Sequence, residues 1–285
     1  MLPTAARRVA FVVTAALLTA CGAILGIDTD LDVKASDAGA AEAEVEAARP
    51  VDTGTDDSTA VDTGVPPPRR PPEGTYVYEV TGSDRVNTPF GSPQQTYGPT
   101  ATLDISYVGA DCFEMLFSFR NEYTEMMRMC VVGLDYVQDL GTRSQRFAVG
   151  SAATTVKCTP GDAYFTTAPS PALRVHDCAG DNTDSRSGGS KFRVAGPYRF
   201  IGDENVDVKG VTVPTRHFKG DKGVSGAQNG SNVADWYFGA ADGVLVRFVR
   251  KVDINFNSPI GQVKYLEDVT MVLAKRPGAD DAGTD

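Results

Sequence analysis

The chain has 285 residues, 41% of them hydrophobic, and a formal net charge of −10 at pH 7. Residues 28–73 carry −8 of that charge, residues 276–285 carry −2 and the first twenty residues carry +2, which leaves −2 for residues 74–275. A nucleic-acid-binding domain is expected to be basic, so this nearly neutral region argues against nucleic acid as a partner.

The first residues combine a charged start, Arg7 and Arg8, with an apolar stretch over 9–18 and the ending Leu18-Thr19-Ala20-Cys21. These parts predict a secretory signal, and the apolar stretch is too short for a helix that remains in a bilayer. The last four residues resemble the lipobox of bacterial lipoproteins. The resemblance implies cleavage before Cys21, acyl chains on that cysteine and a membrane as its partner.

Two or three acyl chains hold a protein on a membrane almost permanently, whereas one chain holds it only marginally. Gly22 stands where some Gram-negative systems place an aspartate that retains lipoproteins at the inner membrane. We therefore expect an envelope protein anchored by lipid, at the outer membrane if the cell has one, facing either the periplasm or the exterior. An ordinary secretory signal followed by chance by a cysteine is the alternative.

The signal over 1–20 is followed by a segment over 21–73 with no aromatic residue, many acidic residues and a proline-rich end. Such a composition cannot bury enough apolar surface to offset the entropy of ordering the chain, so it predicts a disordered linker. Residues 276–285 predict a disordered tail. The aromatic residues lie almost entirely within 74–275, which we expect to be the folded domain.

Four cysteines remain after Cys21, an even number that predicts two disulfides in an exported chain. Apolar residues alternate along 113–119 and again along 123–129. If the chain turns at 120–122, facing residues have numbers that sum to 242, which places Cys112 opposite Cys130 and Glu114 opposite Arg128. This register predicts a Cys112–Cys130 bridge and leaves Cys158 and Cys178 to pair.

Short runs of period two fill residues 74–275, separated by turn residues, and helical periodicity is hard to find. About ten to twelve strands without intervening helices predict an all-β domain. We expect an antiparallel meander that forms a barrel or curved half-barrel, with a sandwich as the alternative. Residues 159–196 are rich in Pro, Gly, Ser and Asp and predict a long loop stapled by Cys158 and Cys178.

The last third of the domain, which includes 211–217, Asp235-Trp236-Tyr237-Phe238 and 242–247, looks like the closing strands of uncharacterised bacterial lipoproteins. Their curved sheets are similar to the half-barrels of lipoprotein carriers. The resemblance covers about 60 residues and concerns turn and core positions. It implies a fold, and it transfers no acyl-chain-binding residue.

The sequence offers few candidates for chemistry. His176 and Ser225 faintly resemble part of a serine-protease triad, but the residues around Ser225 do not match that motif. Cys158, His176 and Cys178 lack the spacing of a zinc site, and Asp177, Asp181 and Asp184 lack the pattern of a calcium loop. His217 and the aromatic run 236–238 are expected to serve packing. We therefore predict no catalytic residue, no metal and no cofactor.

Three functions remain open at this point. The first is a non-enzymatic domain that binds an envelope protein or a small apolar ligand. The second is a carrier of lipid or lipoprotein acyl chains, which needs an apolar cavity on the scale of a lipid chain. The third and weakest is an envelope hydrolase.

Overall fold

The computed structural model describes residues 68–147, 150–183, 190–258 and 261–278. Within these ranges all regular structure is β-strand, and no helix is long and apolar enough to cross a membrane. The all-β prediction is therefore confirmed. Cys21, the signal, most of the linker, Asp184 and most of the tail lie outside the described residues.

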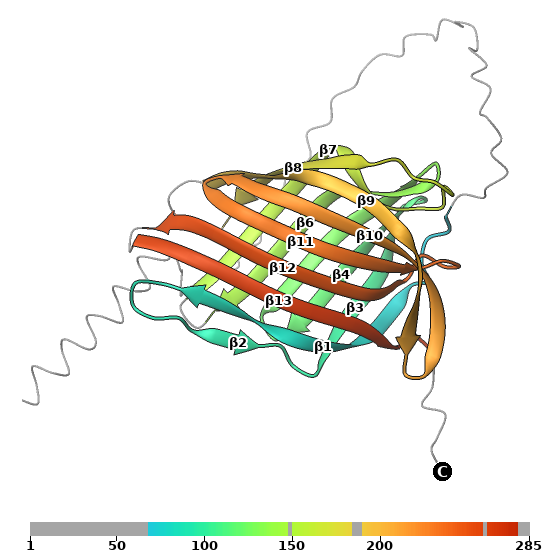
Figure 1. Cartoon of the computed structure of the whole chain (residues 1–285), viewed down its shortest axis with the longest axis horizontal. Helices are drawn as coiled ribbons and strands as arrows, with labels where there is room; N and C mark the ends of the chain where they lie inside the picture. The colour runs from blue at the N-terminus through green and yellow to red at the C-terminus, as the bar shows by residue number, and fades with distance from the viewer. Residues whose placement is uncertain (1–67, 148–149, 184–189, 259–260, 279–285) are drawn as a thin grey trace, which may run out of the picture. The chain divides into compact units, whose positions relative to one another are not determined.

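Thirteen strands follow one another along the described chain, and Figure 1 shows their order. They are β1 (Gly74–Asn87), β2 (Gln94–Thr96), β3 (Thr100–Val108), β4 (Cys112–Arg120), β5 (Tyr123–Val132), β6 (Asp135–Phe147), β7 (Gly150–Thr166), β8 (Arg174–Asn182), β9 (Ser190–Val208), β10 (Val211–Gly226), β11 (Gln228–Gly239), β12 (Leu245–Ser258) and β13 (Gly261–Lys275).

The sheet closes on itself, because β13 pairs with β1 as well as with β12. β1 is shared along its length: its first half pairs with β3, and its second half pairs with the short β2. All these pairings are antiparallel, and twelve strands make up the closed barrel. Of the architectures that the sequence allowed, the barrel is the one present, and closure removes the exposed sheet edges that a half-barrel would keep.

The hairpin formed by β4 and β5 has the register predicted from the sequence. Cys112 faces Cys130 and Glu114 faces Arg128. The Cys112–Cys130 disulfide spans this pair, and Cys158 and Cys178 form the second disulfide across β7 and β8. Along β4 and β5, even-numbered residues point outward and odd-numbered residues point into the barrel. The Cys112–Cys130 disulfide therefore lies on the outer surface.

The predicted long loop over 159–196 is wrong. Most of that segment belongs to β7, β8 and β9, with connections at 167–173 and 183–189. Small residues fill inward positions here because the interior is already occupied. Gly180, for example, lies under the ring of Phe192, where an added Cβ would come within 2.2 Å of the ring. Because this segment lacks a regular alternation of apolar residues, its strands could not be predicted from the sequence.

Asn-Gly pairs are typical of hairpin turns, and the sequence predicts a turn at Asn229-Gly230. That prediction is wrong, because β10 ends at Gly226 and β11 starts at Gln228. Gly230 lies inside β11 with φ 152° and is close to β12, where a Cβ would come within 1.9 Å of the Asp253 carbonyl. The glycine therefore serves a close approach of two strands rather than a turn.

The end of the barrel at the right in Figure 1 carries the β9–β10 and β11–β12 connections, and buried side chains close its interior. The β11–β12 turn places Val244 and Leu245 in the interior, both with 0% exposure, and the Tyr78 hydroxyl donates a 2.6 Å hydrogen bond to the Leu245 carbonyl. Gly243 has φ 65° and its Cα lies against Tyr136, so no side chain fits there. Residues 68–73 run across this end, where Arg70 donates to the Gly109 carbonyl.

The half of the barrel next to this closed end is filled by large side chains. Its members are mostly aromatic and almost completely buried, and they include Tyr76, Phe113, Phe117, Tyr136, Phe165, Phe238 and Phe248. Their rings pack edge-on or tilted at centroid distances such as 5.1 Å for Phe113 and Tyr136. Aromatic pairs of this kind dominate the packing of β cores, and this half leaves no room for a ligand.

We expect replacement of both Cys112 and Cys130 by alanine to lower the free energy of unfolding by about 3 kcal/mol, because the bridge closes a short loop in the unfolded chain. Urea denaturation of the oxidised proteins measures the difference. A loss below about 0.5 kcal/mol would contradict a stabilising role for this outer-surface bridge.

Candidate functional site

The opposite half of the barrel contains a cavity of about 310 Å³. It is lined by inward residues of the strand ends that lead to the β6–β7, β10–β11 and β12–β13 connections, the end at the left in Figure 1. The volume lies at the lower end of the range for small-molecule sites, about 300 to 1,000 Å³. The interior of the barrel is therefore closed at one end and hollow toward the other.

Apolar side chains form the wall of this cavity near its mouth. They are Val86, Phe147, Ile254, Phe256 and Val263, which pack together as one cluster. Phe147, Ile254 and Phe256 are only half-buried, although they point inward. The mouth therefore presents apolar surface that no other side chain of the described chain covers completely.

The floor of the cavity is made of charged side chains, with Arg250 of β12 at its centre. Arg250 donates from Nη1 to Glu125 at 2.7 Å, from Nη2 and Nε to Glu267 at 2.6 and 3.1 Å, and from Nη2 to the Tyr123 hydroxyl at 2.7 Å. Every nitrogen of the guanidinium therefore has an acceptor. Glu267 is completely buried. Burial alone would raise its pKa, but Arg250 and Arg143 outweigh burial and lower the pKa to about 2.

Arg143 of β6 lies beside this group and lines the cavity. Its Nη2 donates to Gln145 at 2.7 Å, to the Tyr265 hydroxyl at 2.6 Å and to Glu267 at 2.8 Å. Among the described residues, its Nη1 and Nε have no hydrogen-bond acceptor. The side chain is 22% exposed, and its guanidinium carbon lies 4.9 Å from the ring centroid of Tyr123 and 5.1 Å from that of Tyr265.

Lys222 of β10 is the third cation of the cavity wall. Its Nζ donates to the Tyr164 hydroxyl at 2.7 Å and lies 3.8 Å from the Asp162 carboxylate. Burial lowers the pKa of Lys222 to about 8, with Asp162 and Glu125 acting in the opposite direction. Burial also raises the pKa of Asp162, more strongly than Lys222 lowers it. An ammonium has three N–H groups, so Lys222 can donate to one further acceptor besides Tyr164 and Asp162.

His176 lies next to Asp162 and is 1% exposed. Its Nε2 is 2.9 Å from the Ala163 carbonyl, so Nε2 carries the proton and Nδ1 is the unprotonated nitrogen, 3.5 Å from Asp162. Burial, together with Lys222, lowers the pKa of His176 to about 2. This histidine is therefore neutral and packs as a ring, stacked on Tyr198 at 4.2 Å.

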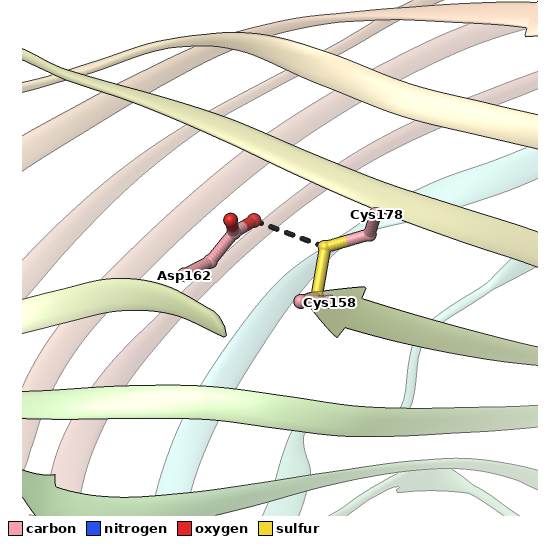
Figure 2. A group of neighbouring side chains, drawn as sticks. All are labelled: Cys158, Asp162 and Cys178. Atoms are coloured by element: carbon pink, nitrogen blue, oxygen red, sulfur yellow. Dashed lines mark hydrogen bonds between the residues drawn. A yellow bond between two sulfur atoms is a disulfide. The ribbon is translucent and has the colours of Figure 1, made fainter. Parts of the chain in front are cut away.

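Figure 2 shows Asp162 beside the inner disulfide. A carboxylate oxygen of Asp162 lies 3.0 Å from Cys178 Sγ. A disulfide sulfur carries no proton, so the sulfur donates nothing to the carboxylate. Cys158, Asp162 and Cys178 form the one group of potential ligands that is close enough to hold a metal within the described residues. Because both cysteines are oxidised, neither supplies the thiolate that a metal requires.

The residues that the sequence singled out for chemistry are not brought together. His176 points into the barrel, whereas Ser225 follows the inward Val224 and lies on the outer face. His217 lies on the outer face too, with Nδ1 2.7 Å from Glu204 and Nε2 2.9 Å from Asp235. Both ring nitrogens of His217 therefore have hydrogen-bond partners, as expected for a histidine that packs in the sheet.

The aromatic run 236–238 serves packing, also as expected. Trp236 and Phe238 belong to the interior cluster, and Tyr237 stacks on His217 outside the barrel at 4.1 Å. Trp236 has an additional role that the sequence did not indicate, because it lines the cavity floor. As the single tryptophan of the chain, it reports on whatever enters the cavity.

The charged floor itself was missed at the sequence level, although the sequence carries a signal for it. The inward alternation of β12 runs through Phe248 and Val252 with Arg250 between them, and that of β13 runs through Tyr265 and Val269 with Glu267 between them. Two interruptions of opposite charge in adjacent strands indicate a buried ion pair. Without a known register, however, each could be read as a surface residue.

Replacement of Arg250 by methionine is expected to lower the free energy of unfolding by about 3 to 5 kcal/mol, because Glu267 and Glu125 lose their shared partner while partly or fully buried. Lys251 is a matched control, since it is adjacent in β12 and forms an exposed 3.4 Å pair with Asp268 of β13. Lys251→Met should cost less than about 1 kcal/mol in the same urea titration. Equal losses for the two variants would contradict the assignment.

The lowered pKa of Lys222 predicts the direction in which the free energy of unfolding changes with pH. Between about 8 and the ordinary value of 10.5, the unfolded chain holds a proton on this amine that the folded protein has lost. Stability contributed at this site therefore rises with pH across that window, by up to about 3 kcal/mol. The pKa of its neighbour Tyr164 is raised well above 10 by burial, so that group stays protonated in the folded state.

The measurement compares the unfolding free energies of wild type and Lys222→Met between pH 7 and pH 10. The advantage of the methionine variant should shrink steadily as pH rises. An unfolding free-energy difference that is independent of pH would show that the amine is not desolvated.

No protein-family model matches this sequence, and no curated protein matches it. Among solved structures, the chain is similar to the crystal structure of the hypothetical lipoprotein YmcC from Escherichia coli K12. That similarity has a TM-score of 0.33 and 9% sequence identity, over 69% of this chain and 84% of the other. A score this low supports no conclusion on fold or function.

Proposed function

We propose that this protein is an envelope lipoprotein, held on the outer membrane by acyl chains on Cys21, whose barrel binds a small ligand without chemical turnover. The observation that carries the proposal is the cavity of about 310 Å³ at one end of an otherwise filled barrel. Filling both halves with aromatic side chains would bury more apolar surface and stabilise the fold further. A half left hollow is therefore best explained by a ligand.

Binding is favoured over catalysis by the state of the polar groups. Arg250 and Glu267 are fully engaged with other side chains, and burial keeps His176 neutral. Ser225 lies on the other face of the wall, so the described structure does not bring Ser225 and His176 together in the cavity.

A carrier of lipoprotein acyl chains is the less favoured function. The cavity corresponds to about ten water-sized volumes of 30 Å³, which suits one short chain rather than two or three. Its floor is charged, whereas a cavity that encloses the two or three acyl chains of a lipoprotein would be apolar throughout.

The proposal is tested with the neutral fluorescent probe N-phenyl-1-naphthylamine, which accepts energy from Trp236. We expect the wild-type protein to bind one molecule of probe. Ala152→Phe, which places a ring in the cavity near its mouth, should abolish binding. Ala153→Phe, one residue along on the outward side of β7, is the matched control and should bind like wild type. Failure of wild type to bind, or equal binding by the two variants, would contradict ligand binding in the cavity.

A further inference from the structure

The side chains that line the cavity are more cationic than anionic. Among the described residues that line it, Arg143, Lys222 and Arg250 are cations and Glu125 is the single anion. Two further carboxylates lie behind the wall: Glu267 beside Arg143 and Arg250, and Asp162 at 3.8 Å from Lys222 Nζ. The three carboxylates balance the three cations in number, but a ligand in the cavity would face mainly the cations.

Two of the cations, Arg143 and Lys222, also have N–H groups that can donate to a ligand. The Nη1 and Nε groups of Arg143 have no acceptor among the described residues. Lys222 Nζ has three N–H groups; it donates to Tyr164 and lies 3.8 Å from Asp162, which leaves one N–H for another acceptor. Both side chains line the cavity, and both lie next to Glu125: Arg143 is its partner on the neighbouring strand, and Lys222 interacts with it electrostatically. A negatively charged group on the floor would supply acceptors to both.

The wall above the floor is apolar, as Phe147, Ile254 and Phe256 show. The site therefore changes character along its depth, from cationic at the floor to apolar at the mouth. A ligand that matches both parts has a charged group at one end and a hydrocarbon part at the other.

We propose that the cavity binds a single-chain anionic amphiphile, with its carboxylate or phosphate on Arg143 and Lys222 and its hydrocarbon chain directed toward the mouth. This inference rests on the proposed ligand-binding function and adds the chemical class and the orientation of the ligand. The volume of about 310 Å³ suits a chain of about ten carbon atoms.

The test compares ligands that share one chain and differ in the head group: decanoate, decyl phosphate, decanol and decyltrimethylammonium. Quenching or enhancement of Trp236 fluorescence follows binding. Either anion should bind about tenfold or more tightly than decanol, because charge-assisted hydrogen bonds are stronger than neutral ones. The tighter of the two anions identifies the head group, and the cation should bind most weakly.

Variants distinguish the contribution of the head group to the affinity from that of the hydrocarbon chain. Lys222→Met should reduce the preference for the anion over decanol while decanol still binds, and Lys222→Arg should retain the preference. Arg143→Met should act like Lys222→Met. Equal affinity for decanoate and decanol in wild type would overturn the anionic class while leaving the binding function intact. Absence of binding by every ligand would contradict the binding function itself.

Orientation has its own readout, because bromine quenches tryptophan only at short range and Trp236 lies at the floor. Bromine on carbon 2 of decanoate should quench Trp236 more strongly than bromine on carbon 10. The reverse order would place the head group at the mouth and overturn the role of Arg143 and Lys222.

Discussion

The ion pair between Arg250 and Glu267 is the constraint on which the interior of this barrel depends. Taking two charges out of water costs several kcal/mol per ion, and the cost is offset only if every donor finds an acceptor. The structure meets that condition through side chains from four strands: Tyr123 and Glu125 on β5, Arg143 on β6, Arg250 on β12 and Glu267 on β13. Because β5 and β12 are not neighbours, the network also ties opposite parts of the barrel together.

This charged layer divides the interior into two parts with different physical character. On one side, aromatic rings pack at the density of a protein core, and the β11–β12 turn seals the end. On the other side, the side chains become smaller or stop short of one another, and a cavity remains. The layer supplies the fixed charges, and the closed wall limits access to one end, which is what a selective binding site for a charged small molecule requires.

The sequence predicts the parts of this fold where inward side chains are large and apolar. The register of the β4–β5 hairpin was predicted correctly from Cys112 to Ser118, including the Cys112–Cys130 bridge, because the cysteine pair, the charge pair and the apolar alternation agreed on it. The same reasoning failed for β7 to β9, where inward positions hold Asp162, His176 and Gly180 in place of large hydrophobic residues. Gly180 makes room for the ring of Phe192, and Asp162 is buried between Lys222 and His176.

The residues of the candidate site could not be predicted from the sequence either. Arg143, Lys222 and Arg250 come from three separate strands, and only closure of the barrel brings them around one space. Their charges gave no indication of burial, because an isolated arginine in a strand is most often on the surface. What the sequence does contain is a pair of polar interruptions in otherwise apolar faces, at 250 and 267, and such interruptions indicate a functional interior once the strands are aligned.

The most direct test of the central claim is a high-resolution crystal structure of the purified mature protein, examined for ordered solvent and bound molecules inside the barrel. The account predicts electron density for water or a ligand on the mouth side of Arg250, and a dry, fully packed interior on the side of Phe113 and Tyr136. Ordered water molecules in both halves of the interior would contradict its division by the buried charges. Side chains that fill the half next to the mouth would contradict it as well.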